Sequence, residues 1–136
     1  DPQKYEQIIK EEKLEEFVTW ENSFIPDEEV NVYFSAADIA ALPYRSASQS
    51  GITQIAFNYA LPVIVTKVGG LPEIVPDGKV GRVIDPENPE LLAHTLDKCL
   101  EENELEEMSS HIVDHKKQFT WDHFVDGIEE LYTQIA

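Results

Sequence analysis

Basic side chains are scarce in this sequence. Its 136 residues contain 10 Lys and Arg against 27 Asp and Glu, a formal net charge of −17, and the two arginines are Arg45 and Arg82. Binding to phosphate backbones takes clustered Lys and Arg, and an anionic membrane surface repels so acidic a chain. We therefore expect no nucleic-acid partner.

Cysteine and long apolar runs are also nearly absent. Cys99 is the one cysteine, so no internal disulfide can form, and it has no metal-ligand spacing with the four histidines. A reducing, cytoplasmic setting fits best. Since no apolar run approaches the ~20 residues that cross a bilayer, we expect no direct membrane insertion. The chain begins inside a helical pattern at Asp1-Pro2, from which we expect a larger protein, truncated here on its N-terminal side.

Helical and strand-like patterns alternate along most of the chain. Helical spacing covers residues 3–12, 27–37, 51–60, 91–100, 105–119 and 120–135, with one turn at 73–75. Short apolar or β-rich runs predict strands at 17–22, 39–42, 62–65 and 82–84. Runs without polar alternation indicate strands buried on both faces, and repeated strand-helix units indicate parallel strands. We predict one α/β domain over residues 1–136, with helices on both faces of the sheet and a run of helices at its end.

The connection from Pro43 to Gly51 has the features of an anion site. A predicted strand ends at Pro43, a serine-rich loop follows, and a helix starts at Gly51. Backbone N–H groups and the positive end of a helix dipole then meet at the carboxyl end of a strand, where such sheets bind ligands. A plainer explanation is open too: Ser48 or Ser50 only caps the helix, and Gly51 only eases a turn.

A second loop, from Lys67 to Glu73, follows the next buried strand. It offers two flexible glycines, Gly69 and Gly70, and then Glu73 at the start of a short helix. The glycines are equally explained by a need for positive φ. We predict that the two loops meet at one edge of the sheet and present amide hydrogens to a diphosphate.

Taken in order, these segments resemble the C-terminal domain of the retaining glycosyltransferases of the large group 1 family, which includes sucrose synthase. The matching segments are A-A-D-I-A-A-L-P-Y at 36–44, Q-S-G at 49–51, I-A-F-N-Y-A-L-P-V-I-V-T at 55–66, V-G-G-L-P-E-I-V at 68–75 and D-G-K-V-G-R-V-I at 77–84. The segment from Asp85 to Leu92 is similar to the family's D-P-x-N-P-E-x-L.

The resemblance implies a GT-B architecture of two facing Rossmann-like domains, of which this chain supplies the C-terminal, donor-binding one. It implies transfer of a sugar from a UDP- or GDP-linked donor with retained configuration, without a metal or other cofactor. The expected partners are the donor and an N-terminal acceptor domain, and the chain alone is expected to be inactive. The family's phosphate-binding Arg and Lys would precede Asp1, so we interpret Arg45 and Lys67 as solvated loop charges.

One departure from the family concerns two Glu that it carries eight positions apart, which correspond to Ala47 and Ile55. Nearby polar side chains are candidates to replace their hydrogen bonds, and a non-catalytic nucleotide-sugar-binding or scaffolding module is the alternative function. Glu73 matches a position close to the donor sugar and is the catalytic candidate, although a carboxylate there is equally explained by the helix dipole. The predicted donor-binding residues are Asn22, Phe24, Ile25, Tyr44, Ser46, Ser48, Gln49, Ser50, Gly51, Thr53, Gln54, Gly69 and Gly70.

Some of these side chains have a second interpretation. Phe24, assigned with Asn22 and Ile25 to the base and ribose, is equally explained as a core residue. The four histidines fall in predicted helices and are interpreted as helix-surface residues. The apolar stripe of 120–135 is explained as core, as a surface facing the acceptor half, or as a homodimer contact. We expect the full-length enzyme to be cytoplasmic, and a peripheral location at the inner face of the membrane agrees with that expectation.

Overall fold

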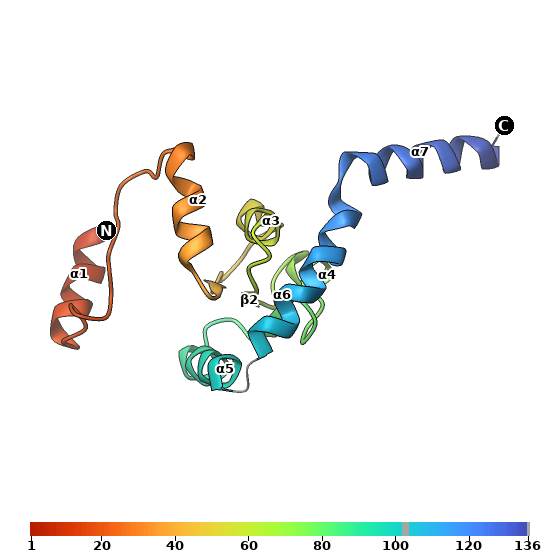
Figure 1. Ribbon diagram of the computed structural model, residues 1–136. Coiled ribbons are helices and arrows are strands. Elements are labelled where there is room, and N and C mark those ends of the chain that lie inside the picture. The colour runs from red at the N-terminus through yellow and green to blue at the C-terminus, as the bar shows by residue number, and fades with distance from the viewer. Residues whose placement is uncertain (102–103, 136) are drawn as a thin grey trace. The chain divides into compact units, whose positions relative to one another are not determined.

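A computed structural model describes residues 1–101 and 104–135 of the chain (Figure 1). Contacts within it separate the chain into two compact units, Asp1–Asn31 and Val32–Ala136, and the single domain expected from the sequence stays a prediction. Helix α2 (Asp27–Ala36) contains the division between them. Among the described residues, no helix combines the length and the apolar character that crossing a bilayer requires.

The first unit contains helix α1 (Pro2–Glu11), whose N-cap Asp1 accepts a hydrogen bond from the amide of Gln3. The predicted strand at 17–22 is wrong, because these residues form a turn and irregular chain. A strand is held by hydrogen bonds to a neighbouring strand, and residues 1–31 contain no second one. Instead, the Trp20 ring stacks on Tyr5 of α1, with 5.2 Å between ring centroids.

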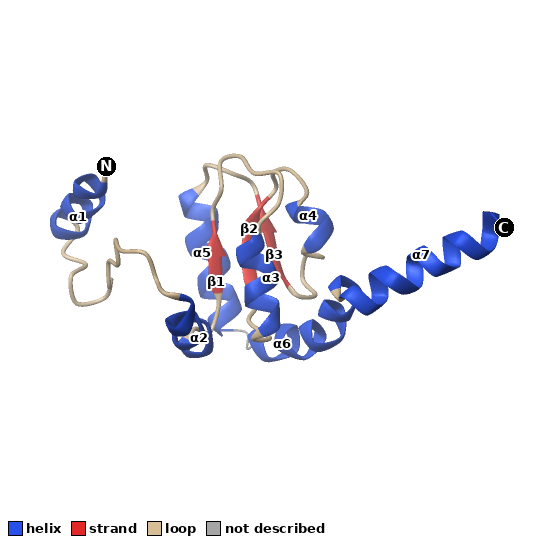
Figure 2. Ribbon diagram, turned by 90° about the horizontal axis from the view of Figure 1, so that it is seen from above, coloured by secondary structure: helices blue, strands red, loops and turns tan. Residues whose placement is uncertain are grey.

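The second unit is built on a three-stranded parallel sheet in the order β1-β2-β3 (Figure 2). Its strands are β1 (Ala40–Leu42), β2 (Val63–Thr66) and β3 (Gly81–Ile84). All four residues of the central β2 are buried, as the unbroken apolar run V-I-V predicted. Ile64 fixes the register, since it pairs with Ala41 on one side and with Arg82 on the other.

Helices α3 (Gly51–Asn58) and α4 (Leu71–Ile74) connect the three strands. After β3 come α5 (Pro89–Glu101), α6 (Glu104–His115), the 3-10 helix η1 (Lys116–Phe119) and α7 (Trp121–Ile135). Helices α3 and α5 lie on opposite faces of the sheet (Figure 1). The predicted fold class, a Rossmann-like parallel sheet with helices on both faces and a run of helices at its end, is therefore confirmed.

The core lies between the sheet and the helices on the α3 side. Phe57 of α3, Val65 of β2, Leu71 of α4 and Ile112 of α6 are completely buried in one cluster. Burying each such side chain stabilises the fold by about 1.5–3 kcal/mol. Because these residues come from four elements, the cluster fixes α3 and α4, and with them the loops that precede both helices.

The last helices behave differently from the core. The predicted helix over 105–119 changes to 3-10 geometry at Lys116, and Thr120 then caps α7 as predicted, its Oγ accepting from the amide of His123 at 3.3 Å. The apolar stripe of α7 is exposed in this unit, with Trp121 80% and Phe124 58% exposed. Core packing within the unit therefore does not explain the stripe, and a homodimer contact through it stays a prediction.

An ion pair braces β3 against α6. The guanidinium of Arg82 donates to both carboxylate oxygens of Glu104, with Nε at 3.1 Å from Oε2, and the thiol of Cys99 lies 3.6 Å from the same oxygen. Hydrogen bonding to Arg82 holds the pKa of Glu104 below its ordinary value, and burial raises the pKa of the Cys99 thiol. Cys99 is thus a buried structural residue.

Candidate functional site

The serine-rich loop and the glycine pair are in direct contact. The amide of Gly70 donates to the carbonyl of Ser48 at 2.8 Å, and a Cβ added to Gly69 would lie 1.8 Å from the Ala47 carbonyl oxygen. The two loops follow β1 and β2, and Figure 2 shows them together at the carboxyl edge of the sheet. The predicted meeting of the two loops is confirmed. We call residues 46–51 and 69–73 the rim.

Gly69 and Gly70 differ in backbone conformation and in their contacts. Gly69 has a φ of 51°, in the left-handed region that glycine favours, and it also touches the neighbouring loop. Gly70 has a φ of −86°, which any residue adopts. Its amide is already engaged by Ser48, so the predicted donation from Gly70 to a diphosphate has a competing partner within the protein.

Helix α3 begins in the rim with an open end. Ser50 occupies the N-cap position, but its side chain makes no capping hydrogen bond, and its Oγ lies 3.3 Å from the hydroxyl of Tyr44. The first amides of a helix have no partner within it. Gly51 is exposed and a Cβ added to it would meet nothing within 4 Å. The explanation that Ser50 simply caps the helix with its hydroxyl does not hold.

Tyr44 ties this helix start to the sheet. Its carbonyl accepts from the hydroxyl of Thr66 at the end of β2, at 2.6 Å, while its own hydroxyl pairs with Ser50. Thr66 is buried and Tyr44 is half-buried. Tyr44 therefore serves the architecture of the rim, beside its predicted role in binding.

Glu73 and Gln49 approach the same side of Gly70. A Cβ added to Gly70 would lie 3.9 Å from Oε2 of Glu73 and 3.7 Å from Cγ of Gln49. Both side chains are exposed, so a carboxylate acceptor and an amide stand beside the start of α4 in contact with solvent. This pair can hydrogen-bond to hydroxyl groups, as the prediction for a sugar requires. Glu73 lies in the first turn of α4, so the dipole explanation also stands.

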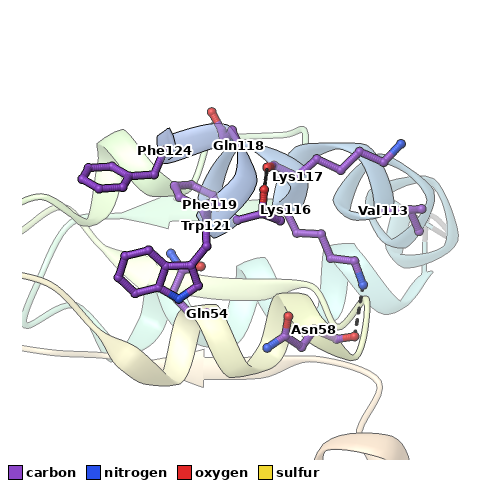
Figure 3. A pocket seen from close by; sticks show the side chains of 10 residues that line it. Gln54, Asn58, Val113, Lys116, Lys117, Gln118, Phe119, Trp121 and Phe124 are labelled. Atoms are coloured by element: carbon purple, nitrogen blue, oxygen red, sulfur yellow. Dashed lines mark hydrogen bonds between the residues drawn. The ribbon is translucent and has the colours of Figure 1, made fainter. Parts of the chain in front are cut away.

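The remaining predicted residues are placed in three different surroundings. Ser46 and Ser48 are exposed on the rim, whereas Thr53 is completely buried and its Oγ1 has no hydrogen-bond partner. Gln54 lines a hollow of about 840 Å³ between α3, η1 and the start of α7 (Figure 3). A donor contact of Thr53 therefore has no support from its placement, because direct contact needs accessible surface.

Asn22, Phe24 and Ile25 belong to the first unit. Phe24 is 86% exposed, so its interpretation as a core residue is wrong for the described unit. The predicted contacts of the three residues with a base or ribose remain predictions.

The positions where the family carries its two Glu contain no carboxylate. Ala47 is half-buried and packs against the core, and Ile55 is half-buried on α3. The rim thus has Glu73 as its carboxylate, with neutral side chains around it.

An exposed ion pair at the same edge was not foreseen from the sequence. Nε of Arg45, in the loop after β1, lies 3.3 Å from Oε1 of Glu87, in the loop after β3. Both help to line a hollow of about 320 Å³ beside Thr66. The signal was present in the D-P-E-N-P segment, because that loop follows a parallel strand and must reach the same edge. Arg45 is a loop charge with a partner.

Parallel strands whose following loops form a common rim, beside an open helix start, define a Rossmann-like domain, a class that binds ligands at this edge of the sheet. The family model for Glycosyl transferases group 1 matches residues 1–118, and the chain belongs to this family.

A curated relative is similar over most of the chain. The D-inositol 3-phosphate glycosyltransferase of Corynebacterium efficiens is 32% identical over 112 residues, which cover 82% of this chain and 26% of that protein. The chain spans about a quarter to a third of the length of the curated relatives it matches.

Solved structures share the fold. HepE of Anabaena, in complex with UDP-glucose, matches with a TM-score of 0.81 at 21% identity, over 97% of this chain and 36% of that one. The C-terminal domain of a group 1 family glycosyl transferase, LpcC of Francisella tularensis, matches with a TM-score of 0.76 at 20% identity, over 85% of this chain and 60% of that one. At these identities the likeness concerns the fold.

Proposed function

We propose that this chain is the C-terminal, donor-binding domain of a retaining glycosyltransferase and binds a UDP- or GDP-linked sugar at the rim. The diphosphate lies against the first amides of α3, and Glu73 with Gln49 receives the hydroxyl groups of the sugar. Transfer of the sugar then requires an acceptor domain elsewhere in the same protein, so the chain alone is inactive. The reaction takes place in the cytoplasm. The names of its relatives and the UDP-glucose bound to HepE support this assignment.

One observation carries the proposal: the contact between the two loops at the carboxyl edge, through Gly70 and Ser48, with the open start of α3 beside it. As a nucleoside diphosphate leaves the sugar, negative charge grows on the bridging oxygen. Amide donors held in place before the reaction stabilise that charge without reorganisation, by several kcal/mol in related settings. A ligand bound at this edge can therefore contact both the start of α3 and the carboxylate of Glu73.

The variant Gly51→Asp tests the placement of the diphosphate. A carboxylate at the start of α3 is favourable for the helix, by about 0.3–1 kcal/mol, and has room because the added Cβ meets nothing. The same charge repels a bound diphosphate, so we expect the affinity for UDP to fall by about tenfold. Isothermal titration of the chain with UDP, UDP-glucose and a GDP sugar measures this, with thermal unfolding as the check on folding.

Gly51→Asn is the matched control, because it adds nearly the same volume without charge. We expect it to bind UDP within about twofold of the unchanged chain, since no charge is added. Equal binding by Gly51→Asp and Gly51→Asn would refute the placement at α3. Absence of binding to any of the three ligands by the unchanged chain would refute donor binding itself.

The alternative, a non-catalytic nucleotide-sugar-binding module, is favoured by Ala47 and Ile55. These residues remove both carboxylates from positions where the family carries them. The two functions predict the same donor binding and differ in turnover. Release of UDP from UDP-glucose by the full-length protein, with and without added acceptor sugars, distinguishes them: binding without any release supports the module.

A further inference from the structure

His115, the last residue of α6, contacts three separate segments of the second unit. Its Nε2 lies 2.8 Å from the carbonyl oxygen of Ile74, the last residue of α4. Its ring meets Phe57 of α3 edge-on and also meets Phe119 of η1, with 5.4 Å between centroids in each case. One half-buried imidazole therefore touches both helices whose starts form the rim.

The ring nitrogens of His115 have polar neighbours in α4 and in η1. The carbonyl of Ile74 can only accept, so Nε2 carries the hydrogen. Nδ1 lies 2.7 Å from Nε2 of Gln118, and the same amide nitrogen lies 3.0 Å from the carbonyl oxygen of His115. This amide nitrogen also lies 3.2 Å from Nε2 of the ring, so the Gln118 amide meets both ring nitrogens. Nε2 of this ring therefore donates to the carbonyl of Ile74.

Helix α4 depends on such outside contacts, because it has four residues and a helix this short is unstable by itself. Gly70, its N-cap, is anchored to Ser48, and Ile74, its last residue, is anchored to His115; both hydrogen bonds measure 2.8 Å. The buried Leu71 and Val75 hold one side of the turn to the core, and these two hydrogen bonds hold its ends. Glu73 lies between the two anchors.

We propose that His115 is a positioning residue for Glu73. By donating to Ile74 while packing against Phe57, it fixes the α4 turn relative to α3, and so fixes the Glu73 carboxylate relative to the helix start. His115 touches no ligand in this arrangement and acts through the α4 backbone. The inference rests on the proposed function, because it assigns Glu73 to the sugar part of the donor.

Two substitutions separate the hydrogen bond from the ring. His115→Phe keeps a ring between Phe57 and Phe119 but removes the donor to Ile74, whereas His115→Gln keeps a donor at the position of Nε2. His111→Phe is the matched control, because His111 lies one turn earlier on α6 and its Nδ1 contacts the carbonyl of Lys79, at 3.2 Å and farther along the chain from Glu73.

UDP and UDP-glucose are the two probes, in isothermal titration of the chain. His115→Phe is expected to weaken UDP-glucose by about fivefold, the factor that one neutral hydrogen bond gives, and to leave UDP unchanged. His115→Gln and His111→Phe are expected to keep the UDP-glucose affinity within about twofold, since each leaves a donor to Ile74.

In the Glu73→Gln background, His115→Phe is expected to have no further effect, because the two residues act through one contact. The rate of amide hydrogen exchange in residues 71–75 is expected to rise in His115→Phe and to stay unchanged in His115→Gln and His111→Phe.

The outcomes are distinguishable. Equal losses for UDP and UDP-glucose, a His115→Gln variant that behaves as His115→Phe, or additive effects with Glu73→Gln overturn the positioning role while donor binding stands. A chain that binds neither probe refutes the proposed function and this inference together. Should His115→Phe fail to fold, Gln118→Ala decides in its place, since it frees the ring without changing the core. An unchanged ratio of UDP-glucose to UDP affinity would then overturn the role.

Discussion

Single residues decide whether the two loops of the rim can touch. Gly69 combines positive φ with a backbone so close to Ala47 that a methyl group has no space, whereas Gly70 has ordinary φ and a Cβ contact of 3.2 Å to Ser48. The sequence shows two equivalent glycines in G-G-L-P-E. The difference between them arises from the neighbouring loop, which the pattern of residues alone does not place.

Gly69→Ala and Gly70→Ala form a matched pair of variants. Gly69→Ala is expected to destabilise the chain by about 2–4 kcal/mol, from positive φ and from the clash with Ala47. Gly70→Ala is expected to stay within about 1 kcal/mol, because the lost flexibility of the unfolded chain offsets a tight contact. Urea unfolding measures both, and similar losses in the two variants would contradict the described contact of Gly69.

At the scale of elements, short segments are positioned by a few polar links between them. Tyr44 ties the start of α3 to β2, His115 ties α6 to α4, and Arg82 ties β3 to Glu104 at the start of α6. None of these links joins residues near in sequence, except Tyr44 with Ser50. Hydrogen bonding to Arg82 lowers the pKa of the Glu104 carboxyl, so the ionised form is favoured in the folded chain.

The contribution of the Arg82–Glu104 ion pair to stability should depend on pH in the acid range. A lowered pKa in the folded state means that the carboxylate stabilises the fold above its ordinary pKa, and that this contribution is lost as pH falls through the lowered value. Glu104→Gln is expected to reduce the free energy of unfolding at pH 7 by about 1–3 kcal/mol, since the pair is partly buried and Arg82 loses its partner. The loss should shrink as pH falls below the ordinary Glu pKa of about 4.3 and through the lowered value, where the carboxyl of the unchanged chain is protonated as well.

Urea unfolding of both chains between pH 3 and pH 7 measures this. Asp114→Asn is the control, because the Asp114–Lys117 pair is exposed. We expect little change for it, because surface ion pairs contribute little to stability. A Glu104→Gln loss independent of pH would contradict the brace as described.

At the scale of the whole molecule, the chain is defined by its family and by its large negative charge. The motifs from Ala36 to Leu92 lie within residues 1–118, which the family model for Glycosyl transferases group 1 matches. Helix α7 lies beyond that match and exposes its apolar stripe. The net charge of −17 brings like charges together when the chain folds.

Salt is therefore expected to stabilise the chain. Raising the ionic strength from about 0.01 to 0.15 M shortens the screening length from about 30 to 8 Å and so weakens the repulsion among acidic side chains. We expect the unfolding temperature to rise by several degrees, about 1 kcal/mol for a chain of this size. Sodium chloride titrations followed by circular dichroism measure it, and a falling temperature would show that attractive pairs outweigh the repulsion.

The sequence by itself determined the α/β class, the strands β1, β2 and β3 and the helices that join them, because hydrophobic periodicity and turn residues act locally. It determined the family, because the motifs occur in order. Only the tertiary structure decided that Phe17–Asn22 is not a strand within the first unit, that Gly70 gives its amide to Ser48, and that His115 holds the turn of Glu73. Each of these depends on a partner distant in sequence or absent from its own unit, and hydrogen bonds form between groups that the fold brings together.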